Sequence, residues 1–183
     1  LLVIDGLGDH LLAQLGPDSA LARLQCGTMT SVYPPTTATA VTTLMTGLAP
    51  QQHGLTGWFV HFRKLGAVTA VLPFMARYGR NPLSGPGASV PLAKVVDCPS
   101  FAARIQGPAV SLLPDFIADS DFSRTVGAGA ARRGYKDLDD FVGQLPALCR
   151  GGDDTRYVYA YWSDFDHACH VHGPSSPQGA AHF

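Results

Sequence analysis

The chain has 183 residues, of which 46% are hydrophobic and 15% charged, enough apolar material for one domain with a core. Its 13 basic and 14 acidic residues give a formal net charge of -1, which excludes a general basic field that would hold a polynucleotide or an anionic membrane. No apolar run approaches the roughly 20 residues of a membrane span, and no basic segment precedes a short apolar core. We therefore expect a globular protein that binds no polynucleotide and has no membrane span.

The four cysteines are scattered, with no CxxC pair, at positions Cys26, Cys98, Cys149 and Cys169. This spacing predicts neither a disulfide framework nor a thiolate zinc site, and we expect most of the thiols to be buried. The chain begins without methionine inside an apolar run, so we expect it to be trimmed at its N-terminus.

The first predicted element is a strand over Leu1 to Ile4, because a continuous apolar run is typical of a parallel strand buried on both faces. Asp5 then lies at the carboxyl end of the strand, where open α/β sheets bind ligands. The alternative is that Asp5 is only a turn residue before a helix that begins at Asp9. Leu11 occupies the position of the third glycine of a dinucleotide fingerprint, which excludes that motif.

A hydroxyl-rich segment from Ser31 to Trp58 contains the next predicted helix. Pro34-Pro35 ends an extended stretch, and the helix is expected to begin near Thr36 to Ala38 and to stop near Gly47 and Pro50. Four residues fit one apolar face of it: Ala40, Val41, Leu44 and Met45. A threonine hydroxyl at a helix N-terminus favours a phosphate, although from this segment alone the favoured interpretation is that Thr36 or Thr37 only caps the helix.

The middle of the chain predicts further alternating elements. Strands are expected at Ala67 to Phe74, Lys94 to Cys98 and Ala109 to Leu113, helices at Pro99 to Ile105 and Lys136 to Cys149, and a loop at Asn81 to Pro91. Within the second helix one side is expected to carry Leu138, Phe141, Val142 and Leu145. The aromatic residues Trp58, Phe59, Phe62, Phe74 and Tyr78 are assigned to the core, with a pocket lining as the alternative.

A strong aromatic strand is predicted at Tyr157 to Trp162, followed by three histidines and two aspartates before Gly173-Pro174. If this segment is helical, Asp166 and His170 share a face and could bind one cation. The alternative is a cluster of surface histidines. Because ligand types and the position after a strand agree, we favour a metal site.

These segments resemble the type I phosphodiesterase/nucleotide pyrophosphatase family of the alkaline phosphatase superfamily. The first match is Tyr33-Pro34-Pro35-Thr36-Thr37, followed by Thr46-Gly47-Leu48, Pro50 and His53-Gly54, and it places the family's nucleophile on Thr37. The family carries a bulkier aromatic where Ala38 stands and often an asparagine where Trp58 stands.

The second match is the family pattern Tyr-x-x-x-x-Asp-x-x-x-His-x-x-Gly-Pro, on which Tyr161, Asp166, His170 and Gly173-Pro174 fall without a gap. The resemblance implies that Asp5 and Thr37 bind one metal, that Asp166 and His170 bind a second, and that Tyr161 positions the organic part of the substrate. It implies two divalent ions, with zinc favoured by the family and manganese as the alternative. His167 and His172 fall outside the match.

The resemblance implies an α/β fold with a largely parallel central sheet flanked by helices, and residues 1–183 as a partial catalytic domain. Because the family's later Asp-His-Gly and histidine do not follow His170, we expect the C-terminal half to be missing and the fragment to have part of each ligand set. The expected function is metal-dependent hydrolysis of a small phosphodiester or nucleotide-like substrate through a threonine nucleophile. The alternatives are a phosphomonoesterase of the same superfamily and a non-catalytic α/β binding domain.

Overall fold

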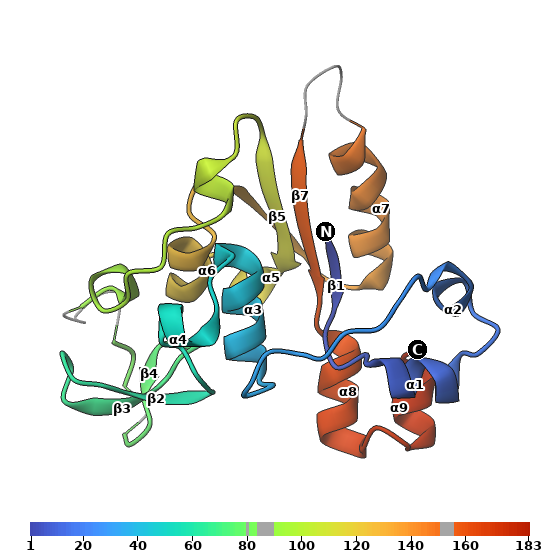
Figure 1. Ribbon diagram of the computed structural model, residues 1–183, viewed down its shortest axis with the longest axis horizontal. Helices are drawn as coiled ribbons and strands as arrows, with labels where there is room; N and C mark the ends of the chain where they lie inside the picture. Colours follow the sequence, from blue (N-terminus) through green and yellow to red (C-terminus); the bar gives the residue numbers. More distant parts are fainter. Residues whose placement is uncertain (80, 84–89, 151–155) are drawn as a thin grey trace. The chain divides into compact units, whose positions relative to one another are not determined.

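A computed structural model of the chain describes residues 1–79, 81–83, 90–150 and 156–183 (Figure 1). The strands are β1 (Leu2–Ile4), β2 (Phe59–Phe62), β3 (Ala67–Ala70), β4 (Met75–Ala76), β5 (Ala109–Pro114), β6 (Ala131–Tyr135) and β7 (Tyr157–Trp162). The α-helices are α1 (Asp9–Leu15), α2 (Ala20–Leu24), α3 (Thr37–Thr46), α4 (Pro50–His53), α5 (Asp115–Ala118), α6 (Asp121–Val126), α7 (Leu138–Cys149), α8 (Asp164–His172) and α9 (Pro177–Ala181). Two 3₁₀ turns, η1 (Leu92–Lys94) and η2 (Ala102–Arg104), complete the described elements.

The described chain divides into two compact units. Unit 1 comprises Leu1–Thr30 and Tyr159–Phe183, and unit 2 comprises Ser31–Val158. The boundary falls inside β7, so this strand contributes residues to both units.

The main sheet has four strands in the order β1-β7-β5-β6. β1 pairs with β7 in parallel, with Val3 opposite Tyr161, and β5 pairs with β6 in parallel, with Leu112 opposite Arg133. Both β5 and β7 are rich in apolar and aromatic residues, as strands inside a parallel sheet require. The predicted α/β class with a largely parallel sheet is confirmed, and helices flank the strands in Figure 1.

The first strand forms where predicted, but it is less buried than the apolar run suggested. Leu1 is 55% exposed and Leu2 50% exposed. In the sheet order β1 has a described neighbour, β7, on one side only, which explains why its side chains are not covered as those of a central strand would be.

Helix α3 begins and ends as predicted, and the structure gives the reasons. Thr36 is the N-cap, and Gly47 adopts the left-handed conformation at φ 71° that ends the helix. The predicted apolar face is partly wrong, because Leu44 is exposed whereas three threonines are fully buried. Those three residues are Thr39, Thr42 and Thr46. Each hydroxyl makes a hydrogen bond, which offsets the free-energy cost of removing it from water.

A separate antiparallel sheet in unit 2 has the order β2-β3-β4. The predicted strand from Ala67 to Phe74 ends early, at Ala70, because the chain turns and returns as β4. Of the aromatic residues assigned to the core, Phe62 and Phe74 are buried and pack edge to face, with ring centroids 6.5 Å apart. The core assignment is wrong for the other three, since Trp58, Phe59 and Tyr78 are exposed.

The remaining expectations have mixed outcomes. No strand forms at Lys94 to Cys98, where η1 and a turn are found, and the helix expected over Pro99 to Ile105 is reduced to η2. β5 and α7 form where predicted, but Leu138 and Val142 of α7 are exposed. Residues 84–89 of the expected loop lie outside the described residues.

The cysteines are free thiols, as expected, but Cys26 and Cys149 are exposed rather than buried. No helix in the described ranges combines the length and the apolar character that a membrane crossing requires.

Candidate active site

In unit 1, Asp5 follows β1 directly and is anchored at both its backbone and its side chain. Its N–H donates to the carbonyl of Trp162 at 2.9 Å, which extends the β1–β7 pairing by one residue. Its Oδ1 accepts the N–H of Gly6 at 3.0 Å. The parallel register therefore fixes a carboxylate at the carboxyl end of the sheet, as predicted from the sequence.

Tyr161 holds the second oxygen of this carboxylate. Its phenol donates to Asp5 Oδ2 at 2.6 Å, because Tyr161 lies opposite Val3 in the register and its side chain reaches the end of β1. Burial, followed by the charge and hydrogen bond of Asp5, raises the pKa of the Tyr161 phenol far above its usual value. The phenol therefore stays protonated and acts as a donor to Asp5, a contact that the sequence did not predict.

Asp166 and His170 lie on one face of α8, as predicted, with Asp166 Oδ2 3.4 Å from His170 Nε2. Ser163 precedes the helix, and its carbonyl accepts the N–H of His167 at 3.1 Å, which starts the helix immediately after β7. His170 is largely exposed, whereas Asp166 is half-buried. The helical spacing thus places a carboxylate and an imidazole together at the end of the strand.

Gly6 brings the Asp5 turn against α8. A Cβ atom added at Gly6 would lie 2.9 Å from Asp166 Cα and 3.0 Å from Asp166 Oδ1, and Gly6 itself has φ 75°. Both the close approach and the backbone conformation require glycine at this position. The Gly6 contact was not recognised from the sequence, although a glycine directly after a strand-end aspartate is the available signal.

The negative charge of Asp5 acts on the carboxyl group of Asp166. Burial, followed by the negative charge of Asp5, raises the pKa of the Asp166 carboxyl, while His170 and His167 act in the opposite direction. The charge of Asp5 thus disfavours the ionised form of Asp166, and a bound cation would relieve this repulsion.

In unit 2, six threonines lie between positions 36 and 46, and five of their hydroxyls are engaged. Thr36 Oγ1 accepts the N–H of Thr39 at 3.4 Å and lies 3.0 Å from Thr39 Oγ1. Thr42 and Thr46 each donate at 2.6 Å to the carbonyl four residues earlier, and Thr43 bonds to His53 at 3.1 Å. Among the described residues the sixth hydroxyl, that of Thr37, has no hydrogen-bond partner.

Thr37 is half-buried and is the first residue of α3. The cap accounts for the N–H of Thr39, and within the described part of the chain no partner is assigned to the backbone N–H groups of Thr37 and Ala38. A helix leaves such N–H groups unpaired at its first turn, together with the positive end of its dipole. A free hydroxyl thus accompanies free N–H donors, an arrangement suited to phosphate oxygens.

His53, in α4, supports α3 through a hydrogen bond to Thr43. The sequence motif that contains His53 did not predict this role. Leu55 N–H donates to His53 Nδ1 at 3.0 Å, so His53 Nε2 carries the proton and donates to Thr43 Oγ1. Burial lowers the pKa of His53, which favours this neutral form.

The side chains of unit 1 include donors of the kinds that divalent metals bind. Asp5, Asp166 and His170 supply oxygen and imidazole ligands of the type that zinc and manganese accept. Over residues 1–79, 81–83, 90–150 and 156–183, however, no three His, Cys, Asp or Glu side chains converge on one point. The donor types fit a divalent ion, and the ligand set from these residues is incomplete. Since Thr37 belongs to unit 2 and the other three residues to unit 1, their assignment to shared metals stays a prediction.

Comparison with protein families decides the relationship. The chain matches the family described as type I phosphodiesterase / nucleotide pyrophosphatase over residues 1–182. It belongs to this family. The family resemblance inferred from the two short motifs is therefore confirmed over nearly the whole chain. A comparison with curated proteins gave no match.

Proposed function

We propose that this phosphodiesterase-family chain hydrolyses phosphodiester or pyrophosphate bonds in small nucleotide-like substrates, with Thr37 as the nucleophile. The proposal rests on the hydrogen bonding of the six threonine hydroxyls from Thr36 to Thr46. Within the described structure five of them have a partner, and that of Thr37 has none. Neighbouring N–H groups of Thr37 and Ala38 are suited to orient a phosphoryl oxygen.

In the proposed reaction, the Thr37 oxygen attacks phosphorus and forms a phosphoryl ester as the bond to the leaving oxygen breaks. The hydroxyl proton is released and the leaving oxygen gains a proton from water. Water then attacks the same phosphorus, the bond to Thr37 breaks, and the hydroxyl is restored. A threonine hydroxyl is a weak nucleophile at neutral pH, so it needs activation that no described residue bonded to it provides.

Divalent ions are part of the proposal. Asp5 and Thr37 would hold one ion, and Asp166 and His170 the other, with zinc favoured and manganese as the alternative. Bound ions would supply positive charge that favours ionisation of the hydroxyl and stabilises charge on phosphoryl oxygens. Tyr161 keeps Asp5 in one orientation through its 2.6 Å hydrogen bond. Its role toward the organic part of the substrate stays a prediction.

Hydrolysis of bis(4-nitrophenyl) phosphate by the full-length protein tests the proposal. Activity should disappear after chelation and return when zinc or manganese is restored. Acid quenching during turnover, followed by peptide mass spectrometry, should find the phosphoryl adduct on Thr37. A parallel assay with 4-nitrophenyl phosphate separates the alternatives, since faster turnover of this monoester would favour a phosphomonoesterase.

A folded, metal-loaded protein that hydrolyses neither compound would favour the non-catalytic binding domain. Full activity in metal-free protein would contradict the metal-dependent mechanism and leave the family membership untouched.

A further inference from the structure

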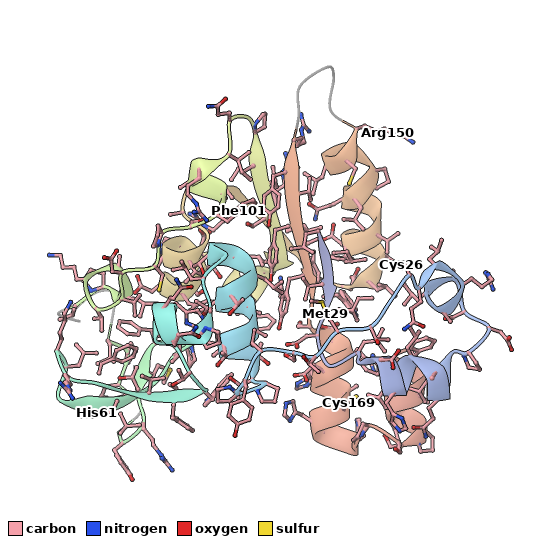
Figure 2. All side chains as sticks on the ribbon, viewed as in Figure 1. Cys26, Met29, His61, Phe101, Arg150 and Cys169 are labelled. Atoms are coloured by element: carbon pink, nitrogen blue, oxygen red, sulfur yellow. The ribbon has the colours of Figure 1, made fainter. Side chains whose placement is uncertain are left out.

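The solvent-facing side of the β2-β3-β4 sheet carries an aromatic and cationic cluster that the proposed reaction does not use. The antiparallel register places Phe59 opposite Ala70 and His61 opposite Val68. The N–H of Arg77 donates to the carbonyl of Val68 at 2.9 Å, which continues the β3–β4 pairing so that Arg77 lies opposite Val68. Opposite residues of a ladder face the same side of a sheet, so Arg77 shares the side of His61. Figure 2 labels His61 on this sheet.

Arg77 is held in place by two aromatic rings. The central carbon of its guanidinium lies 4.8 Å from the centroid of the Phe59 ring and 5.8 Å from that of Tyr78. These are cation–π distances. Because Ala70 has a small side chain, the arginine can reach across β3 to Phe59 on β2. We call Phe59, Arg77 and Tyr78 the Arg77 platform.

No carboxylate in the described part of the chain forms an ion pair with Arg77. The ion pairs among the described residues are Arg132–Asp119 and His170–Asp166, and neither involves Arg77. Its guanidinium also has no hydrogen bond to another described residue. In the sequence there is no acidic residue from Ser19 to Val96. The platform therefore lies in a cationic stretch of a chain whose net charge is -1.

Nearby cations add to the local positive charge. Arg63 and Lys64 are exposed in the turn between β2 and β3, and Lys64 donates to the carbonyl of Lys94 at 3.2 Å. Arg77 differs from them because its rings restrict its orientation while leaving the N–H edge of the guanidinium unbonded. A planar guanidinium held in this way matches two oxygens of a phosphate, whereas a mobile ammonium provides only a point charge.

We propose that the Arg77 platform is a binding site for the phosphate group of a soluble organic phosphate. A restricted guanidinium loses less conformational freedom when it forms paired hydrogen bonds to phosphate, and no carboxylate of the described ranges is paired with it. A soluble ligand is favoured over a membrane, because Phe59 is only 46% exposed and its ring is already in contact with Arg77. The site is independent of the hydrolytic mechanism, since it needs neither Thr37 nor a metal.

Titration of the full-length protein with phenyl phosphate in excess chelator tests the site without turnover or phosphate binding to metal. Binding is followed by calorimetry and by amide shifts in β2, β3 and β4. Arg77→Met should weaken binding at least about tenfold, the loss expected for a charged hydrogen-bonded pair. Arg63→Met removes the same charge from the same sheet and should weaken binding less than about fivefold.

Phe59→Leu keeps an apolar side chain and removes the ring that contacts Arg77. The charge of Arg77 stays, so weaker phenyl phosphate binding in this variant would be due to the lost ring. Equal losses in Arg77→Met and Arg63→Met would overturn the site in favour of diffuse attraction. Unchanged binding in Arg77→Met, or no binding to the wild-type protein, would also overturn it. Binding to vesicles of phosphatidylglycerol and phosphatidylcholine without binding to phenyl phosphate would replace the soluble ligand by a lipid surface. None of these outcomes depends on whether the protein hydrolyses phosphodiesters.

Discussion

Helices α3 and α8 carry residues of the proposed active site, and their polar side chains differ in burial. Most polar side chains of α3 are buried, whereas none of α8 is. α3 has no charged residue, and its threonines are mostly buried and bonded within unit 2. α8 has two aspartates and three histidines, and of its nine residues only Phe165 and Ala168 are buried. The comparison teaches that α3 is a neutral, internally satisfied support that leaves one hydroxyl available. α8 instead presents ionisable side chains, two of which, Asp166 and His170, lie 3.4 Å apart.

The largest effect is expected for the available hydroxyl of α3. Thr37→Ala should lower kcat for a phosphodiester at least about a thousandfold, because the alanine has no oxygen to attack phosphorus. The free energy of unfolding should change little, since the Thr37 hydroxyl has no hydrogen bond among the described residues. Metal content should also change little, because the other proposed ligands, Asp5, Asp166 and His170, remain. Thr37→Ser keeps a hydroxyl and is the matched control, which should retain far more activity. Near-normal hydrolysis by Thr37→Ala would refute the nucleophile assignment.

The next effect separates the packing of α8 from its charges. Phe165 is 1% exposed, so Phe165→Ala should lower the free energy of unfolding by about 3–5 kcal/mol. Val171 is on the same helix but 59% exposed, and Val171→Ala should cost less than about 0.5 kcal/mol. Denaturant unfolding measures both changes. Equal losses of unfolding free energy in the two variants would show that the burial of Phe165 does not anchor α8.

A smaller and two-sided effect is expected at Asp166. Asp166→Asn should weaken zinc binding and lower activity about tenfold or more, because a carboxylate ligand is lost. The metal-free variant should melt at a higher temperature than metal-free wild type, because the repulsion between Asp5 and Asp166 is removed. Asp164→Asn on the same helix, where Asp164 accepts the Ser163 hydroxyl, is the control. A lower melting temperature in metal-free Asp166→Asn would contradict the repulsion argument.

The smallest effect concerns the support of α3 by His53. Burial lowers the pKa of folded His53 below the value of 6.5 expected in the unfolded chain. As pH falls below 6.5, the unfolded state binds the proton first, so stability is lost progressively until the folded pKa is passed. The contribution is complete above 6.5 and its slope is at most about 1.4 kcal/mol per pH unit. Denaturant unfolding from pH 8 to pH 5 measures the free energy of unfolding of wild type and of His53→Gln. The value for wild type should fall more steeply below pH 6.5 than that of the variant, and parallel pH curves would rule the effect out.

The sequence predicted the elements whose signals are local. Pro34-Pro35, the threonine cap and Gly47 defined α3, and the aromatic run at Tyr157 to Trp162 defined β7. The spacing of Asp166 and His170 also predicted their shared face. Each of these features depends on residues only a few positions apart.

The features that were missed depend on pairing between distant segments. Tyr161 binds Asp5 because the β1–β7 register brings them together across the length of the chain. Ala67 to Phe74 looked like one strand, although the pairing of Ala70 with Met75 requires a turn between them. Trp58, Phe59 and Tyr78 were assigned to the core because aromatic residues are usually buried, and no local signal showed that these three side chains are exposed.

Gly6 has a consequence for how substitutions in this chain should be interpreted. Its missing side chain lets the Asp5 turn lie against Asp166, and no larger residue fits without displacing the backbone of α8. Gly6→Ala would therefore move both carboxylates at once. A mutational survey scored by activity would rank position 6 with the reacting residues, although the glycine contributes no chemical group to the reaction.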